Sequence, residues 1–232
     1  MENRFQDRAE AGRYLAQRLE SYGGREDVIV LGLPRGGVPV AYEVASRLRV
    51  PLDVFVVRKL GVPGFEEMAM GAIASGGTRV LNEDIVRQLG SDAQKMLESV
   101  TAKELLELER QEKEFRGDRP WPKLRGRIVI LVDDGLATGA TMRAAAAALR
   151  QRDVARIVVA VPVGAPETCR EFEQEVDETV CAISPEGFQA VGQHYEDFAQ
   201  TSDEEVRHLL EKAAGIEGRT EKKLPFGGRI ML

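Results

Sequence analysis

Two acidic residues, Asp133 and Asp134, stand side by side directly after an apolar run, and a loop of small residues follows them. Adjacent carboxylates can accept hydrogen bonds from vicinal hydroxyls or help to hold a hydrated Mg²⁺. The loop leads into an alanine-rich helical pattern, so it offers exposed N–H groups, a helix dipole and two threonine hydroxyls to an anion. It consists of Ala137, Thr138, Gly139, Ala140 and Thr141. This segment therefore suits a phosphate and a diol, the two groups that a ribose 5-phosphate presents.

A second candidate site follows the apolar run 28–33, in the turn Pro34-Arg35-Gly36-Gly37. Two glycines allow unusual backbone angles, and their N–H groups can face an anion beside the Arg35 guanidinium. Taken alone, a glycine-rich turn with a solvated arginine would explain this segment better. Its occurrence beside the 133–141 segment makes us favour an anion site.

The elements that position these loops alternate along the chain. Because the strand-like runs are apolar throughout, they predict an α/β fold with a parallel sheet covered by helices on both faces. Both loops then lie at carboxyl ends of strands, where such sheets bind ligands. Strands are expected at 28–33, 52–57, 128–132, 157–163 and 178–183, with shorter ones at 70–74 and 78–81. Helices are expected at 4–22, 40–48, 83–115 (broken near Gly90), 141–150, 166–173 and 202–214. Residues 60–68 have no periodicity and predict a surface loop.

The composition limits the classes of protein that the chain can represent. Its 232 residues suffice for one large domain or two small ones. With 32 basic and 38 acidic residues, the net charge of −6 argues against a general nucleic-acid binder. No apolar run approaches the roughly 18 residues that span a bilayer, and the charged N-terminus does not resemble a signal peptide. We therefore expect a cytoplasmic protein without a membrane or nucleic-acid partner.

The small numbers of cysteine and histidine residues argue against a disulfide-stabilised protein and against a histidine-rich metalloprotein. Cys169 and Cys181 lie outside any metal-ligand spacing and imply no disulfide framework. His194 and His208 are too few for a histidine-rich metal centre.

The segment 129–141 resembles the phosphoribosyl-pyrophosphate (PRPP) signature of the type I phosphoribosyltransferases. That signature has four apolar residues, two acids, a short variable step and a Thr-Gly-x-Thr loop, and only Ala140 departs from the commoner glycine. The resemblance implies a Rossmann-like parallel-sheet core with a small hood. It implies one domain over residues 1–214, with the hood mainly from 184–200 and a helical insertion at 83–115. Residues 215–232 would form a flexible tail.

The resemblance also implies roles for the two loops. Asp133 and Asp134 would bind the ribose hydroxyls and, through water or the ribose, a Mg²⁺ ion. The 137–141 loop would bind the 5-phosphate. Arg35, Gly36 and Gly37 would bind pyrophosphate, with a cis peptide bond between Pro34 and Arg35.

Two further segments receive roles from the same resemblance. A mobile loop from Arg58 to Met70 would close over the reactants. Arg58 and Lys59 would contact pyrophosphate. Glu67, which we favour over Glu66, would protonate or orient the acceptor. In the hood, Phe188 and Tyr195, with Phe198 nearby, would hold the acceptor by stacking. The alternative for the first segment is a solvated loop without a catalytic role. The alternative for the second is that its aromatic side chains only pack in a small secondary core.

The implied function is a Mg²⁺-dependent pentosyltransferase that moves the 5-phosphoribosyl group of PRPP to a nitrogenous base in nucleotide salvage. Ala137 stands where the 6-oxopurine enzymes have an aspartate, and the pattern is closer to the adenine type, but the acceptor stays undetermined. The alternatives are a PRPP-binding regulator without transfer activity and a hydrolase of PRPP or nucleotides. A homo-oligomer that uses the insertion 83–115 is one option, and a solvated helix is the other.

Overall fold

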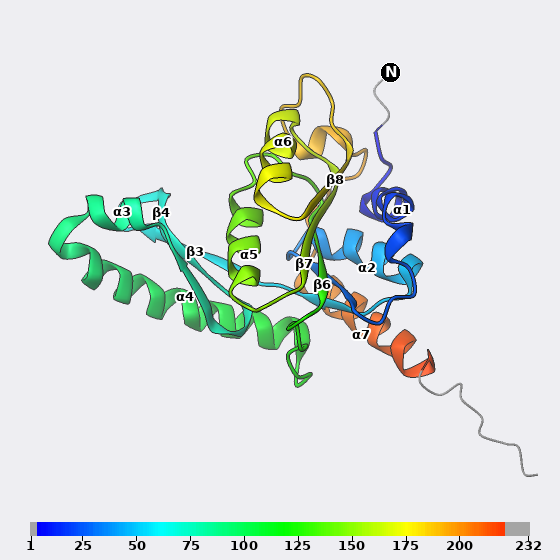
Figure 1. The fold of residues 1–232 in the computed structure, drawn as a ribbon, viewed down its shortest axis with the longest axis horizontal. Coiled ribbons are helices and arrows are strands. Elements are labelled where there is room, and N and C mark those ends of the chain that lie inside the picture. Colours follow the sequence, from blue (N-terminus) through cyan, green and yellow to red (C-terminus); the bar gives the residue numbers. More distant parts are fainter. Residues whose placement is uncertain (1–3, 221–232) are drawn as a thin grey trace, which may run out of the picture.

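A five-stranded parallel sheet forms the centre of the computed structural model, which describes residues 4–220 without the side chains of residues 66, 67, 91 and 216–220 (Figure 1). Its strands lie in the order β2-β1-β6-β7-β8. Their bounds are β1 Val28–Gly32, β2 Leu52–Val54, β6 Ile128–Val132, β7 Arg156–Val163 and β8 Glu178–Ile183. The parallel α/β fold predicted from the apolar runs is confirmed.

Alternate side chains of each strand enter one of two cores, as the twofold repeat of a strand requires. Val28 and Val30 of β1 face a core shared with α1, α2 and α7. Ile29 and Leu31 face a core shared with α5 and α6. The bounds of these helices are α1 Arg8–Arg18, α2 Gly37–Leu48, α5 Ala140–Arg150, α6 Pro166–Glu175 and α7 Asp203–Thr220. Helices on both faces leave the ends of the strands as the accessible edges of the sheet.

A three-stranded antiparallel sheet, the small hood of the fold, extends away from the core together with the long helix α4 (Figure 1). It comprises β3 Val57–Val62, β4 Phe65–Ala74 and β5 Thr78–Leu81. The expectation of a surface loop at 60–68 is therefore wrong. The segment forms a hairpin, in which Pro63 and Gly64 make the turn between β3 and β4. Gly64 has φ at 82°, a conformation that favours glycine. The predicted strands at 70–74 and 78–81 are confirmed.

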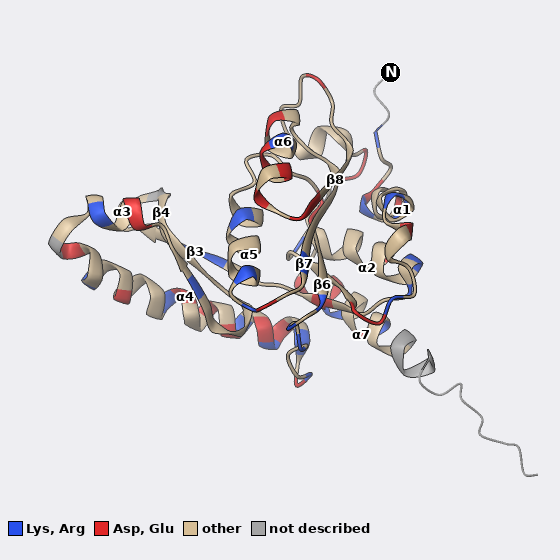
Figure 2. Ribbon diagram, in the orientation of Figure 1, with Lys and Arg blue, Asp and Glu red and all other residues tan. Residues whose placement is uncertain are grey.

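The helical insertion is present, with the break that the sequence predicts. Its parts are α3 Glu83–Gln88, a short 3₁₀ turn at Gly90–Asp92 and α4 Ala93–Arg116. Lys, Arg and Glu side chains are interspersed along α4 (Figure 2). Helix α7 runs past the expected end at residue 214 to Thr220, so the tail is not irregular from Gly215. The rest of the predicted tail, 221–232, lies outside the described residues.

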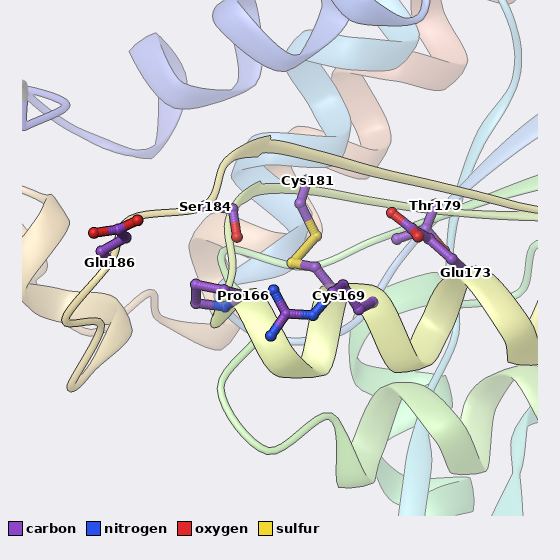
Figure 3. A pocket seen from close by; sticks show the side chains of 8 residues that line it. Pro166, Cys169, Glu173, Thr179, Cys181, Ser184 and Glu186 are labelled. Atoms are coloured by element: carbon purple, nitrogen blue, oxygen red, sulfur yellow. A yellow bond between two sulfur atoms is a disulfide. The ribbon is translucent and has the colours of Figure 1, made fainter.

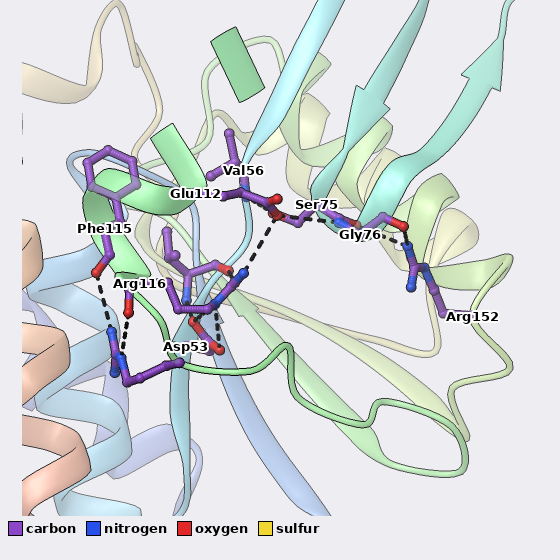
Figure 4. A network of polar contacts seen from close by, with 10 residues as sticks. Asp53, Val56, Ser75, Gly76, Glu112, Phe115, Arg116 and Arg152 are labelled. Atoms are coloured by element: carbon purple, nitrogen blue, oxygen red, sulfur yellow. Dashed lines mark hydrogen bonds and ion pairs between the residues drawn. The ribbon is translucent and has the colours of Figure 1, made fainter. Parts of the chain in front are cut away.

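A buried polar network fastens α4 to the parallel sheet (Figure 4). Arg116, at the end of α4, donates to both Asp53 carboxylate oxygens at 3.2 and 3.3 Å and to the Val54 carbonyl oxygen at 3.1 Å. Both charged residues are 8% exposed. The Arg116 guanidinium also lies over Trp121, 4.3 Å from the ring centroid. Glu112 extends the network to the Gly76 amide of the antiparallel sheet.

The N-terminal residues form backbone hydrogen bonds with the segment 184–200, which follows β8. Phe5 donates to the His194 carbonyl oxygen at 2.9 Å and accepts from the Glu196 amide at 2.8 Å. Asp7 then caps α1 by accepting from the Glu10 amide at 2.7 Å. Arg8 is thereby the first residue of α1, fixed beside the segment 184–200. Whether this segment contributes a hood over an acceptor stays a prediction.

Cys169 of α6 and Cys181 of β8 form a disulfide, contrary to the expectation that these cysteines imply none (Figure 3). Twelve residues separate them, and only the packing of α6 against β8 brings their Cα atoms to 6.4 Å. The spacing in sequence could not reveal this packing. The disulfide borders a surface pocket of about 410 Å³ between these two elements. None of the helices within residues 4–220 is both long and apolar enough to cross a membrane.

Candidate functional site

The two candidate loops meet because their strands, β1 and β6, are neighbours in the sheet. Gly32 is paired with Val132, and the Leu33 amide donates to the Val132 carbonyl oxygen at 2.9 Å. A Cβ atom at Gly37 would lie 2.7 Å from that oxygen, and one at Gly36 would collide with the Asp134 carboxylate. Side chains at these two positions would therefore push the loops apart. Glycine here serves the close approach of one loop to the other.

Asp133 and Asp134 lie at the carboxyl end of β6, in the place that the sequence predicts. The Asp133 Oδ1 atom accepts from the Asp134 amide at 2.9 Å. Arg8 binds Asp134 Oδ2 through Nε at 2.9 Å and Nη2 at 2.8 Å. Asp134 is largely buried, its side chain being 17% exposed. The two carboxyl groups thus share a site of low polarity with one arginine.

Burial raises the pKa of the Asp133 carboxyl well above its ordinary value, and the charge of Asp134 beside it raises this pKa further. Burial also raises the pKa of Asp134, although the Arg8 guanidinium opposes this effect. Ionisation of these carboxyl groups in the folded protein therefore lowers the free energy of unfolding. Such a cost is typical of groups kept for a ligand.

One oxygen of each acid is left for a ligand. Within residues 4–220, no hydrogen bond engages Asp133 Oδ2 or Asp134 Oδ1. These two acceptors come from adjacent residues, so they suit two neighbouring hydroxyl donors.

The loop 137–141 runs directly into the N-terminus of α5. Gly139 has φ at 72°, a left-handed conformation that favours glycine, and Ala140 begins the helix. A Cβ atom at Gly139 would lie 2.6 Å from the Phe172 ring of α6, so this helix forms the back wall of the loop. Thr168 of α6 donates to the Ala137 carbonyl oxygen at 2.6 Å. Ala137, Thr138 and Ala140 are exposed, so the outer side of the loop is open to a ligand.

Arg143, one turn into α5, braces the same loop. Its Nη1 donates to the Thr138 carbonyl oxygen at 2.8 Å, while Glu175 and Glu171 of α6 bind its remaining nitrogens. The guanidinium charge is therefore neutralised within the protein. We conclude that the loop's own N–H groups and hydroxyls, rather than Arg143, are available to an anion.

The comparisons with known proteins bear on this geometry. The family model described as "Phosphoribosyl transferase domain" matches residues 4–196. The chain belongs to the phosphoribosyltransferase family.

Individual relatives agree with this membership. Two Mycobacterium tuberculosis proteins, MT0597 of strain CDC 1551 and Rv0571c of strain H37Rv, are 52% identical to the chain over 209 residues. Their names assign them provisionally to the phosphoribosyl transferases. The match covers 90% of this chain but 47% of theirs, so the chain spans about half the length of these curated relatives. The crystal structure of TT1426 from Thermus thermophilus is similar, with a TM-score of 0.80, 44% identity and coverage of 90% of this chain and 98% of that one.

The predicted pyrophosphate loop, 34–37, lies within this phosphoribosyltransferase fold. The Pro34–Arg35 peptide bond is cis, as the resemblance implies. Gly36 and Gly37 adjoin the acids, whereas the Arg35 side chain is 42% exposed and reaches Asp203 of α7 at 3.5 Å. Arg35 therefore borders the candidate site, and its contact with pyrophosphate stays a prediction.

The three predicted catalytic residues lie on the antiparallel hairpin rather than on a loop. Arg58 of β3 is bound by Glu104 of α4, through Nε at 2.9 Å and Nη2 at 2.7 Å. Lys59 is exposed. Glu67 lies on β4, but its side chain is outside what the structure describes, as is that of Glu66. No hydrogen bond or ion pair in the described part of the chain joins Arg58 to the acids, so the catalytic roles stay predictions.

The predicted acceptor residues lie on the other side of the acids, in the segment 184–200. Tyr195 is 3% exposed, and its hydroxyl donates to the Asp134 carbonyl oxygen at 2.6 Å. It packs against Phe5 and Phe198 at 5.8 and 5.0 Å between ring centroids. Phe188 stacks on His194 at 5.5 Å. Tyr195 thus supports the acid loop from behind, and acceptor binding by either residue stays a prediction.

Two contributors to the site were missed from the sequence. Arg8 lies 126 residues from Asp134 in the chain, and Thr168 lies 31 from Ala137. Neither belongs to a motif. An arginine in the first turn of a surface helix and a threonine in another carry no signal of their tertiary contacts.

Proposed function

We propose that this phosphoribosyltransferase domain transfers the 5-phosphoribosyl group of PRPP to a nitrogenous base and releases pyrophosphate. The observation that carries the proposal is that two carboxylates and an open loop of the phosphate-binding type meet at the carboxyl ends of the strands. In the described part of the chain, one oxygen of each carboxylate accepts no hydrogen bond. The acids and the loop follow one another closely in the chain. A ribose 5-phosphate carries the matching diol and phosphate.

The ribose hydroxyls would bind the free carboxylate oxygens of Asp133 and Asp134. Hydrogen bonds to charged acceptors are the stronger kind and contribute roughly 1.5–3 kcal/mol each. The same two negative charges lie beside the ribose ring, which becomes positive as pyrophosphate departs. They would therefore stabilise the transition state more than the ground state.

The 5-phosphate would bind the backbone N–H groups of the loop 137–141 and the hydroxyls of Thr138 and Thr141. The N-terminus of α5 supplies the favourable dipole. Phe172 and Thr168 hold the loop from behind, so it is formed before the ligand arrives. Little ordering would then oppose binding.

Pyrophosphate would bind beside Gly36 and Gly37, and Mg²⁺ would neutralise part of its charge. The described residues contain no cluster of three or more His, Cys, Asp or Glu side chains that could enclose a metal. Asp133 and Asp134 would hold this cation only indirectly, through its waters or the ribose hydroxyls, while the substrate phosphates would be its main ligands. The protein's own part is to orient the ribose, to hold the charged groups and to exclude water.

A transfer assay tests the proposal against its alternatives. The protein is incubated with PRPP, Mg²⁺ and a panel of purine and pyrimidine bases, and pyrophosphate release and nucleotide formation are measured. The proposal predicts pyrophosphate release that depends on one class of base and an equal amount of nucleotide. Pyrophosphate release without any base would indicate a hydrolase. PRPP binding without consumption would indicate a regulator.

A further inference from the structure

Arg8 occupies a place in the ribose site that neither the signature nor the family match assigns to it. As the first residue of α1, it follows the capping residue Asp7 and projects toward the end of β6. Its side chain is only 12% exposed. A guanidinium is rarely buried to this extent unless it is paired, and Asp134 is its charged partner here.

The remaining contacts of Arg8 fix the guanidinium in one orientation. Its Nη1 donates to the Ala199 carbonyl oxygen at 2.6 Å, and its central carbon, Cζ, lies 4.0 Å from the centroid of the Phe198 ring. The Nε atom would lie 3.2 Å from a Cβ atom at Gly36. Arg8 thus lies where three parts of the site meet, namely the acid loop, the pyrophosphate loop and the segment 184–200.

The pairing of Arg8 with Asp134 is one-sided. Both contacts, from Nε and from Nη2, reach the same oxygen, Oδ2. A bidentate pair would engage both carboxylate oxygens, so neither would be free of a hydrogen bond from the protein. In the described part of the chain, Oδ1 accepts no hydrogen bond. The arrangement fixes the plane of the carboxylate while one oxygen stays available.

We propose that Arg8 is a positioning residue for the ribose diol, which holds Asp134 by Oδ2 so that Oδ1 faces a ribose hydroxyl. This inference rests on the proposed function, because it assumes that Asp134 binds the ribose. It adds a residue from the N-terminal helix to a site otherwise built from loops after β1 and β6. Arg8 acts through Asp134 and need not touch the sugar.

A comparison of two sugar phosphates separates positioning from general support of the fold. Ribose 5-phosphate carries the vicinal diol, and 2,3-dideoxyribose 5-phosphate lacks both of its hydroxyls. Calorimetry gives the ratio of their affinities for the full chain and for its Arg8→Gln, Arg8→Lys and Arg13→Gln variants. Arg13 serves as the matched control, since it lies on the same helix with its side chain 57% exposed and only a 3.7 Å ion pair to Glu43.

We expect Arg8→Gln to lose about tenfold or more in affinity for ribose 5-phosphate, the worth of one charge-assisted hydrogen bond. Its affinity for the dideoxy sugar should stay close to that of the wild type, so that the ratio collapses. Arg8→Lys keeps a charge but not the fork of donors, so it should fall between Arg8→Gln and the wild type. Arg13→Gln should match the wild type. In the Asp134→Asn background, Arg8→Gln should have no further effect on the ratio.

The opposing outcomes are distinct. Equal losses for both sugars in Arg8→Gln and Arg8→Lys would show that Arg8 only supports the fold. Wild-type affinities for both sugars in Arg8→Gln would show that it does not position Asp134. Either result overturns the inference and leaves the proposed function in place. A wild-type protein that does not distinguish the two sugars would instead contradict the assignment of the diol to the acids, and the inference with it.

Discussion

The Asp133 carboxyl, which we propose to bind ribose, opposes the stability of the fold. Burial and the neighbouring Asp134 charge raise its pKa in the folded protein, whereas the unfolded chain ionises at the ordinary value. Below the unfolded pKa both states are protonated and the group is neutral to stability. As the pH rises from there through the raised folded pKa, the free energy of unfolding falls by about 1.4 kcal/mol for each unit of difference.

The first prediction follows from this sign. Asp133→Asn keeps the Oδ1 atom that accepts the Asp134 amide but removes the charge. At neutral pH the variant should melt several degrees above the wild type, since about 1 kcal/mol corresponds to roughly 2–4 °C in a domain of this size. Thermal unfolding from pH 4 to 8 should show this gap growing with pH. The exposed control Asp118→Asn should show none, and a gap independent of pH would refute the charge explanation.

Gly139 gives a second prediction at the residue scale. Gly139→Ala forces a left-handed alanine and places its Cβ atom against the Phe172 ring, so the phosphate loop must shift. Gly126→Ala is the matched control, because Gly126 has a similar φ, 73°, with no atom within 4 Å of the added Cβ. Both variants should lose about 1–2 kcal/mol of stability, but only Gly139→Ala should lose affinity for ribose 5-phosphate. Calorimetry and urea unfolding measure the two effects, and equal affinities would argue against the loop as the phosphate site.

At the scale of elements, a buried ion pair between Arg116 and Asp53 helps to attach α4 to the parallel sheet. Burial raises the Asp53 pKa and the Arg116 charge opposes this, so removal of the arginine leaves an unpaired buried acid. Arg116→Met should therefore cost about 3–5 kcal/mol in the free energy of unfolding. The double variant Arg116→Met/Asp53→Leu should recover much of this loss in urea titrations.

An exposed pair provides the contrast. Arg25 and Asp27 also form two hydrogen bonds, but their side chains are 44% and 50% exposed. Arg25→Met should cost less than about 1 kcal/mol. Similar losses for Arg25→Met and Arg116→Met would show that burial does not determine how much the Arg116–Asp53 pair contributes to the free energy of unfolding.

The hairpin of β3 and β4 yields the fourth prediction. Residues 57–60 pair in register with 71–74, and β4 also pairs with β5, so the amides of 71–74 and alternate amides of 57–60 are bonded in the free protein. Hydrogen exchange without ligand should therefore be slow at 71–74 and at alternate residues of 57–60, and faster at the turn formed by Pro63 and Gly64. Fast exchange throughout 57–70 that slows with PRPP would restore the mobile loop that the sequence suggested.

For the whole molecule, the features that the sequence predicts best are local. The apolar runs indicated the five parallel strands, and the signature at 129–141 located the acids and the loop correctly. The sequence wrongly indicates a loop at 60–68, because the glycines and acids of this hairpin hide the alternation of Leu60, Val62 and Met70, which are buried. Strand pairing supplied what composition could not show.

Contacts between distant segments account for the rest. The Arg8–Asp134 pair, the Thr168 support of the phosphate loop and the disulfide between α6 and β8 each join elements whose approach depends on the complete fold. Their residue types are ordinary at their positions in the sequence. The positions of the candidate binding groups could therefore be predicted from a motif, whereas the residues that hold these groups required the structure.

The central claim is that the acids after β6 and the loop before α5 together bind PRPP. Calorimetry with PRPP and Mg²⁺ on the wild type and on the Asp133→Asn/Asp134→Asn double variant tests it most directly. We predict saturable binding to the wild type and a loss of about a hundredfold or more in the double variant, which still folds, because two charge-assisted hydrogen bonds are lost. No Mg²⁺-dependent binding at millimolar PRPP, or wild-type affinity in the double variant, would contradict the claim.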